Sequence, residues 1–148
     1  MILERRKMQF DIKHVCLVVR DLQKAMEKLR SLWDIGPFRF IDSDHPEGIV
    51  HGKNIHYTGK LAFAKAGDIE IELIEPTEGE SIWWEFLRNK GEGVHHFGIF
   101  VPNLDKELAR FQEKGIGVLQ SGESEHVKLA YMDTEGMLGV VIELLQNK

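Results

Sequence analysis

The feature that most constrains the fold of this chain is an internal repeat with a spacing of 82 residues. Sliding the sequence by that distance places His14 on His96 and Val19 on Val101. A duplicated sequence of this kind predicts two copies of one supersecondary unit that share a core. The 148 residues are enough for two such units within one globular domain.

Each half repeats the same order of predicted elements. An alternating strand opens each half, at residues 13–19 and 94–101, and a helix with apolar residues at helical spacing follows it. Asp21 and Asn103 precede these helices and are favoured N-cap residues. Further strands complete each half, and residues 81–89 predict a short helix between them. Both halves therefore read strand, helix, strands.

This order sets the expected domain organisation, a single domain over residues 1–148. We expect module one at about 11–76, a linker helix at about 81–90 and module two at about 93–146. The first half is about 11 residues longer than the second, and we place the extra residues in a loop over 42–54.

Each half also carries one histidine in its first strand and one glutamate in its last. The triplets around Glu72 and Glu143 are both Ile-Glu-Leu, and the histidines are His14 and His96. A carboxylate inside an apolar strand is costly unless it has a partner. The four side chains can satisfy one another by sharing a divalent cation, and a mixed nitrogen and oxygen set suits Mn, Fe, Co, Ni or Zn. Free coordination positions on such an ion would make the site catalytic.

Other histidines and glutamates receive a plainer interpretation. The register of the repeat selects His96 as the ligand, and strand alternation then turns His95 to the other, solvated face. Solvent-facing positions are expected for Glu70, Glu75 and Glu80. Surface positions are expected for His45, His51, His56 and His126, with His56 or Tyr57 as alternatives for the site entrance.

Charge and composition exclude several classes of protein. The net charge is −5, and the 19 basic residues are mixed with 24 acidic ones, so no basic stripe predicts a nucleic-acid partner. No apolar run approaches the roughly 20 residues of a membrane span, and the first ten residues lack the apolar core of a signal peptide. We therefore expect a soluble cytoplasmic protein.

The single cysteine and the tryptophans are expected to be structural. Cys16 excludes an internal disulfide framework, and we expect it to fill a small space in the core. Core or interface packing is expected for Trp33, Trp83 and Trp84.

Four phrases carry a resemblance to a known family: "HVCLVVRDL", "IELIEP", "GEGVHHFGIFV" and "GVVIELLQ". In this order they resemble the vicinal oxygen chelate superfamily of glyoxalases, bleomycin resistance proteins and dioxygenases, and within it the methylmalonyl-CoA epimerases. The similarity runs from about Ile12 to Gln146. It implies an α+β fold, in which two tandem βαβββ modules form a curved, partly open mixed β-barrel. It also implies a metal site inside the barrel with His14, Glu72, His96 and Glu143 as ligands.

The resemblance further implies a metal-dependent isomerase that moves a proton alpha to a thioester through a metal-stabilised enolate. An acyl-CoA or other thioester is the implied substrate, Glu143 and Glu72 are the implied proton carriers, and a homodimer is implied. Two features depart from the family. Relatives often carry glutamine where Glu72 stands, and residues 54–67 lack the further carboxylate that would serve as a second base.

Two alternatives stay open at this point. The His, Glu, His, Glu set also resembles lactoylglutathione lyase of the glyoxalase I type, whose chemistry is a related metal-assisted proton transfer. A non-catalytic protein that binds a drug or metabolite is the other alternative. An extradiol dioxygenase is disfavoured, because a second glutamate would crowd its iron site.

Overall fold

The computed structural model of the chain describes residues 11–148, so the predicted absence of a signal peptide concerns residues that lie outside the described part. The strands are β1 Asp11–Val18, β2 Arg39–His45, β3 Ile49–Val50, β4 Lys53–Asn54, β5 Tyr57–Ala66, β6 Ile69–Pro76, β7 Gly93–Phe100, β8 Val118–Glu123, β9 Val127–Met132 and β10 Val141–Asn147. The helices are α1 Leu22–Trp33, α2 Ile82–Asn89, α3 Leu104–Glu113 and α4 Glu135–Leu138.

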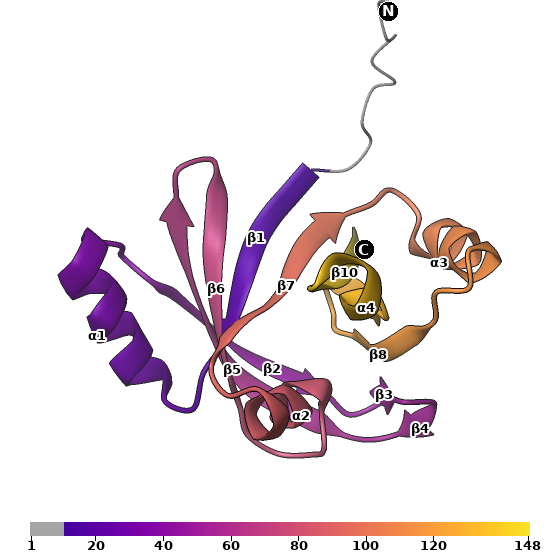
Figure 1. Cartoon of the computed structure of the whole chain (residues 1–148), viewed down its shortest axis with the longest axis horizontal. Helices are drawn as coiled ribbons and strands as arrows, with labels where there is room; N and C mark the ends of the chain where they lie inside the picture. The colour runs from indigo at the N-terminus through magenta and orange to yellow at the C-terminus, as the bar shows by residue number, and fades with distance from the viewer. Residues whose placement is uncertain (1–10) are drawn as a thin grey trace, which may run out of the picture.

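All described strands belong to one curled sheet whose order reveals the duplication. The order is β2-β5-β6-β1-β7-β10-β9-β8-β3-β4, so the two halves run outward from a central seam in matching sequence. Strands β1 and β7 pair antiparallel along that seam, while β1 with β6 and β7 with β10 pair in parallel. Figure 1 shows the sheet curling into a half-barrel. The α+β class and the curved barrel expected from the sequence are confirmed.

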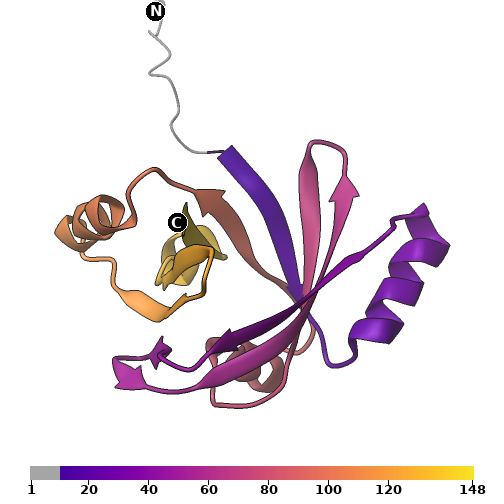
Figure 2. The same ribbon diagram turned by 180° about the vertical axis from the view of Figure 1, so that it is seen from behind.

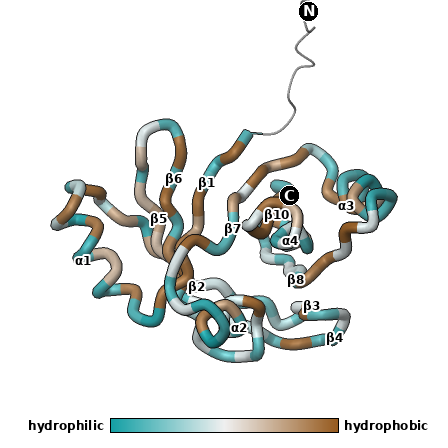
Figure 3. The backbone as a smooth tube through the Cα atoms, viewed as in Figure 1, coloured by the Kyte–Doolittle hydropathy of each residue, from teal (hydrophilic) through white to brown (hydrophobic). Residues whose placement is uncertain are grey.

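Helices α1 and α3 cover the outer face of the curl on opposite sides of the molecule (Figures 1 and 2). Strand alternation explains how each strand serves both faces. Leu73 packs with residues of α1 and Leu144 packs with residues of α3. Their neighbours Glu72 and Glu143 consequently point to the inner face. The tube in Figure 3 alternates between polar and apolar residues along both helices, as expected for helices with one buried face.

The predicted helix starts are confirmed by their hydrogen bonds. The Asp21 side chain accepts from the Lys24 N–H at 3.0 Å, and the Asn103 side chain accepts from the Lys106 N–H at the same distance. Ser81 caps α2 in the same way, with its hydroxyl accepting from Trp84 N–H. Each such cap stabilises its helix by about 1 kcal/mol.

The predicted loop over residues 42–54 is wrong, because most of the segment is strand. It contains the end of β2 and the short strands β3 and β4. Strand β3 pairs with β8, so a turn after His45 carries the chain from one edge of the sheet to the other. The free edge of β8 supplies the hydrogen-bond partners that a polar segment lacks within its own half.

Two β-bulges interrupt the central seam, one in each half. In the pairing of β1 with β7, Lys13 and His95 are skipped, and each directly precedes the repeated histidine of its strand. A bulge re-aims side chains next to it. The prediction that His95 faces solvent on the opposite side is wrong for this reason: His95 is buried, and its Nδ1 lies 2.9 Å from Nδ1 of His96.

The apolar predictions are largely met. Cys16 and Trp83 are buried in the inner core cluster, and Trp84 is half-buried against it. Trp33 ends α1 and is 69% exposed, so the prediction that it packs in the core of this chain is wrong. Within residues 11–148, none of the helices has the length and apolar character needed to cross a bilayer.

A glycine on the seam makes room for His14 and yields a first prediction. Gly98 is the cross-strand partner of His14, and a Cβ at Gly98 would overlap the His14 ring. Gly98→Ala is expected to lower the free energy of unfolding by about 1–3 kcal/mol through overpacking. Urea denaturation measures this. Gly136→Ala is the control, because a Cβ at Gly136 meets nothing within 4 Å. Equal stability of the two variants would contradict the prediction.

A candidate metal centre

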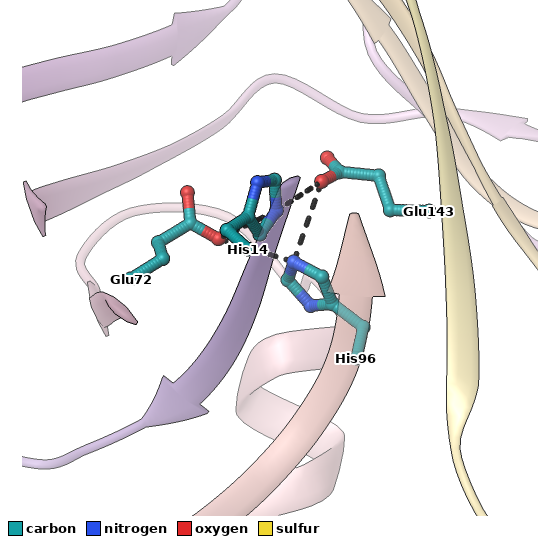
Figure 4. A group of neighbouring side chains, drawn as sticks. All are labelled: His14, Glu72, His96 and Glu143. Atoms are coloured by element: carbon teal, nitrogen blue, oxygen red, sulfur yellow. Dashed lines mark hydrogen bonds and ion pairs between the residues drawn. The ribbon is translucent and has the colours of Figure 1, made fainter. Parts of the chain in front are cut away.

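Four side chains from the two halves converge on the inner face of the sheet (Figure 4). They are His14 of β1, Glu72 of β6, His96 of β7 and Glu143 of β10. The two imidazoles reach the centre through Nε2 and the two carboxylates through Oε1. The distances are 3.0 Å for His14 to Glu143, 3.4 Å for His14 to Glu72, 3.1 Å for His96 to Glu72 and 3.4 Å for His96 to Glu143.

Matching registers in the two halves produce this convergence. Cys16 pairs with Glu72 across β1 and β6, and Gly98 pairs with Glu143 across β7 and β10. Each glutamate is therefore placed beside the strand that carries its own half's histidine. All four residues are buried, with exposures between 0% for His96 and 5% for His14. All four come from this one chain.

The spacing of these atoms fits a single ion. The four ligand atoms lie within 4.8 Å of one another. Nitrogen and carboxylate ligands sit about 2.0–2.2 Å from a divalent transition metal, so atoms sharing one ion are separated by roughly 3–4.4 Å. Two neutral imidazoles and two carboxylates also match the charge of a divalent cation. The residues present thus fit the metal that the sequence implied.

The charges of the cluster are balanced by protons when no cation is bound. Burial acts to lower the pKa of His96, but the nearby Glu143 and Glu72 outweigh it and raise the pKa to about 9. The pKa of His14 is raised in the same way, with Glu143 as the main counteracting group. Burial alone would raise the pKa of Glu143, yet His96 and His14 hold it below its ordinary value.

An aromatic ring stands against each imidazole at matching places in the two halves. Phe63 pairs with Glu72 across β5 and β6, and Tyr131 pairs with Glu143 across β9 and β10. The Phe63 ring lies 6.1 Å from the His14 ring, and the Tyr131 ring lies 4.9 Å from the His96 ring, both in edge-on geometry. Sequence reasoning missed this pair. A comparison of the strands that precede Glu72 and Glu143 in the two halves, made for aromatic residues, could have found it.

His95 supports His96 from behind. His96 directs Nε2 to the carboxylates, and because its raised pKa keeps both ring nitrogens protonated near neutral pH, its Nδ1 donates to Nδ1 of His95 at 2.9 Å. Burial and the neighbouring His96 lower the pKa of His95 to about 3, which keeps its ring neutral and able to accept. Histidine ligands of metals are commonly oriented by such a second hydrogen bond. The adjacent histidines of the sequence therefore differ in place: one faces the centre and the other fixes its orientation.

A cavity of about 340 Å³ opens beside the cluster. Its volume lies in the range of small-molecule sites. His14, Glu72 and Glu143 form part of its wall, and Phe63, Trp83 and Tyr131 add aromatic surface. The buried Trp83 Nε1 is a donor with no acceptor among the described residues. A molecule in this cavity would be in contact with both the cluster and the aromatic surface beside it.

The remaining histidine predictions have a mixed outcome. His51, His56 and His126 are exposed as expected. The prediction that His45 lies on the surface is wrong. It is buried where β2 crosses towards β8, and it lines the cavity. Neither His56 nor Tyr57 lines the cavity, and the Tyr57 hydroxyl is instead buried and donates to the Ser121 carbonyl at 3.1 Å.

Three glutamates outside the cluster were predicted to face solvent, and the structure confirms this for only one of them. Glu80 is exposed as expected, while Glu70 and Glu75 are half-buried. Glu75 accepts a hydrogen bond from the Leu22 N–H at 2.8 Å, which ties the start of α1 to β6. Glu70 pairs with Arg39 at the cavity rim.

Comparisons with known proteins extend these observations. A family model described as the Glyoxalase/Bleomycin resistance protein/Dioxygenase superfamily matches residues 13–131. The mitochondrial methylmalonyl-CoA epimerase of Bos taurus is 28% identical over 143 residues, covering 91% of this chain and 73% of that protein. The uncharacterized protein YqjC of Bacillus subtilis is 29% identical over 91 residues, which cover 60% of this chain and 65% of YqjC, less than two thirds of its length.

Solved structures share the fold. A variant of the Streptomyces coelicolor methylmalonyl-CoA epimerase, in complex with 2-nitronate-propionyl-CoA, superposes with a TM-score of 0.64 at 21% identity. The superposition covers 92% of this chain and 93% of that one. At this level of identity the likeness is one of fold.

The raised imidazole pKa values predict that metal affinity depends on pH. Because His96 has a pKa of about 9 in the metal-free protein, it holds a proton below that pH, and a cation must displace the proton to bind. Affinity for Zn²⁺ or Co²⁺ is expected to rise as the pH increases from about 6 to 9. Titration calorimetry in buffers of different ionisation enthalpy measures the protons released. Affinity that is independent of pH, with no proton release, would contradict this.

The raised pKa of His96 also determines how the stability of the metal-free protein depends on pH. The pKa of this ring is 6.5 in the unfolded chain and higher in the folded one, so the protonated ring stabilises the fold fully below about pH 6.5. That contribution is lost as the pH rises through about 9.

The support from His95 predicts a second effect on affinity. His95→Leu removes the acceptor of the His96 N–H and is expected to weaken metal binding by about 10–100-fold. His95→Gln retains an acceptor and is expected to recover part of the loss. Metal titrations of both variants, with melting curves to check the fold, decide the matter. Identical affinities for the Leu and Gln variants would mean that His95 only fills space.

Proposed function

Because the chain belongs to the glyoxalase, bleomycin resistance protein and dioxygenase superfamily, we propose that it is a divalent-metal-dependent isomerase that transfers a proton alpha to a thioester carbonyl. The proposed substrate class is an acyl-CoA, with methylmalonyl-CoA as the first candidate. The observation that carries the proposal is the buried set of two imidazoles and two carboxylates on the wall of a cavity. The epimerase relative, aligned over most of this chain, supports the reaction class.

In this proposal His14, Glu72, His96 and Glu143 hold the ion. When bound, a divalent metal supplies Lewis-acid stabilisation of negative charge on substrate oxygens. The chain itself supplies the geometry and the proton carrier. Within the cluster Glu143 makes its contacts through Oε1, so Oε2 is the atom that would take and return a proton. Glu72 occupies the equivalent place in the first half and is the other candidate carrier.

The cavity walls favour the charge separation that such a reaction needs. Phe63, Trp83 and Tyr131 exclude water from one side of the cluster, and electrostatic interactions are stronger in such a dry site.

The lactoylglutathione lyase alternative is favoured by one observation, that Glu72 is a carboxylate rather than an amide and reaches the cluster as closely as Glu143 does. Both reactions begin with proton abstraction next to a carbonyl. The two are separated by substrate: methylmalonyl-CoA for the isomerase, and the hemithioacetal of methylglyoxal and glutathione for the lyase.

Solvent deuterium exchange tests the proposed function directly. The metal-loaded protein is expected to incorporate deuterium at the alpha carbon of methylmalonyl-CoA, measured by mass spectrometry. Glu143→Gln is expected to slow the exchange by about 10²–10⁴-fold, the usual contribution of a general base. Glu80→Gln, at an exposed site outside the cavity, is the control and is expected to leave the rate unchanged.

Three outcomes would contradict the proposal. An unchanged rate for Glu143→Gln would remove this residue from the proton transfer. Turnover of the hemithioacetal with no exchange into methylmalonyl-CoA would replace the isomerase with the lyase. A protein that retains no transition metal yet holds an aromatic ligand tightly would favour the non-catalytic binding class.

A further inference from the structure

Inversion at a carbon requires proton carriers on two sides of it. One group removes the proton from one face, and a second group delivers a proton to the opposite face. Glu143 serves one face in the proposed function. The second carrier must therefore stand on a different wall of the same cavity, and the sequence alone left it unassigned.

The candidates for the second proton carrier are the ionisable side chains that line the cavity among the described residues. Outside the cluster, its ionisable side chains are Lys13, Arg39, Asp42, His45, Glu70, His126 and Tyr131. Burial, with Glu143 and Glu72 nearby, raises the pKa of Tyr131 well above its ordinary value, so Tyr131 keeps its proton and cannot act as a base. The others apart from His45 are exposed or lie at the rim, and Glu70 is paired with Arg39. His45 is 5% exposed and is the buried base that remains.

Strand β2 presents His45 to the cavity. Ile41, Ser43 and His45 alternate along β2 and all line the cavity. The order β2-β5-β6-β1 places β2 three strands from the seam, whereas Glu143 stands on β10 in the other half. The two residues therefore belong to different walls of the curl, as the positions of β2 and β10 in Figures 1 and 2 show.

The contacts of His45 fix its tautomer. Nδ1 lies 3.4 Å from the Glu123 carbonyl oxygen, which can only accept, so Nδ1 carries the proton. Nε2 lies 2.9 Å from the Ser43 hydroxyl and accepts its hydrogen bond. The ring also packs 4.8 Å from that of Tyr57. A base held by a third group, with its acceptor nitrogen beside a hydroxyl on the cavity wall, is the arrangement expected of a positioned proton carrier.

We propose that His45 is the second proton-transfer residue of this site, acting through Nε2 on the face of the substrate carbon opposite Glu143. The assignment rests on the proposed isomerase function. As substrate enters, the Ser43 hydroxyl rotates away and Nε2 takes the alpha proton, while the C–H electron pair moves into the thioester carbonyl to give the enolate. Glu143, protonated by exchange with solvent before the substrate binds, then returns a proton to the other face. The turnover leaves His45 protonated and Glu143 ionised, which is the state that takes the opposite epimer by the reverse sequence.

The electrostatics of His45 agree with this role. Burial lowers the pKa of the ring, so that it is neutral and able to accept a proton near neutral pH. The charge of Glu143 acts in the opposite direction and would stabilise the protonated ring once formed.

The test uses each epimer of methylmalonyl-CoA separately in D₂O, with the metal-loaded full-length protein. Wild type is expected to label and invert both epimers. His45→Gln is expected to lose epimerisation by at least about 100-fold. It should still label one epimer without inverting it, because Glu143 alone can remove and return a proton on its own face. The other epimer should stay unlabelled. A residue with a purely structural role would slow both epimers equally.

Controls keep the outcomes distinct. His51→Gln replaces an exposed histidine outside the cavity and should behave as wild type. Melting curves and metal content verify the fold and the metal site, and His45→Asn, which keeps the donor to Glu123, replaces His45→Gln if the latter fails either check. Epimerisation within a few-fold of wild type, or equal loss of label from both epimers in a folded, metal-loaded variant, overturns the assignment. Absence of label with wild type itself overturns the proposed function instead.

Discussion

The fold of this protein depends on how four buried ionisable side chains balance one another's charge. Two carboxylates and two imidazoles lie within 4.8 Å and almost without access to solvent. Removing one member would leave a buried charge unpaired, which costs several kcal/mol. Protons on the imidazoles or a shared cation both meet the requirement, and without a cation the two carboxylates raise the imidazole pKa values and so favour the first. The seam between β1 and β7 has to hold both histidines in register for either solution to exist.

Duplication explains why the sequence alone predicted so much of this arrangement. Residues at equivalent places in two copies meet near the axis that relates the copies, so a repeated histidine and a repeated glutamate predict one shared cluster. The caps Asp21 and Asn103 and the strand alternation around Glu72 and Glu143 follow from local rules that a single sequence contains. The resemblance to the superfamily is confirmed. The roles of the four residues as ligands and proton carriers stay predictions.

The sequence could not predict features that depend on contacts between distant strands. His95 was expected on the opposite face, because alternation assumes an unbroken ladder, and the bulge that turns it is set by the pairing of β7 with β1. His45 lies in a polar segment that reads as a surface loop. It is buried only because β3 pairs with β8 and draws the end of β2 across the sheet. Neither event leaves a mark in the local pattern of residues.

The same crossing breaks the symmetry that duplication would impose. Two identical halves would give the cavity two equal walls, with the same groups facing a bound molecule from both sides. Phe63 and Tyr131 still obey that symmetry. The longer first half departs from it, because the turn after His45 joins the two edges of the sheet and leaves a buried imidazole there, 3.4 Å from the Glu123 carbonyl of the second half. A carbon held at the cluster would then face a carboxylate on one side and an imidazole on the other, so each face would meet its own proton carrier.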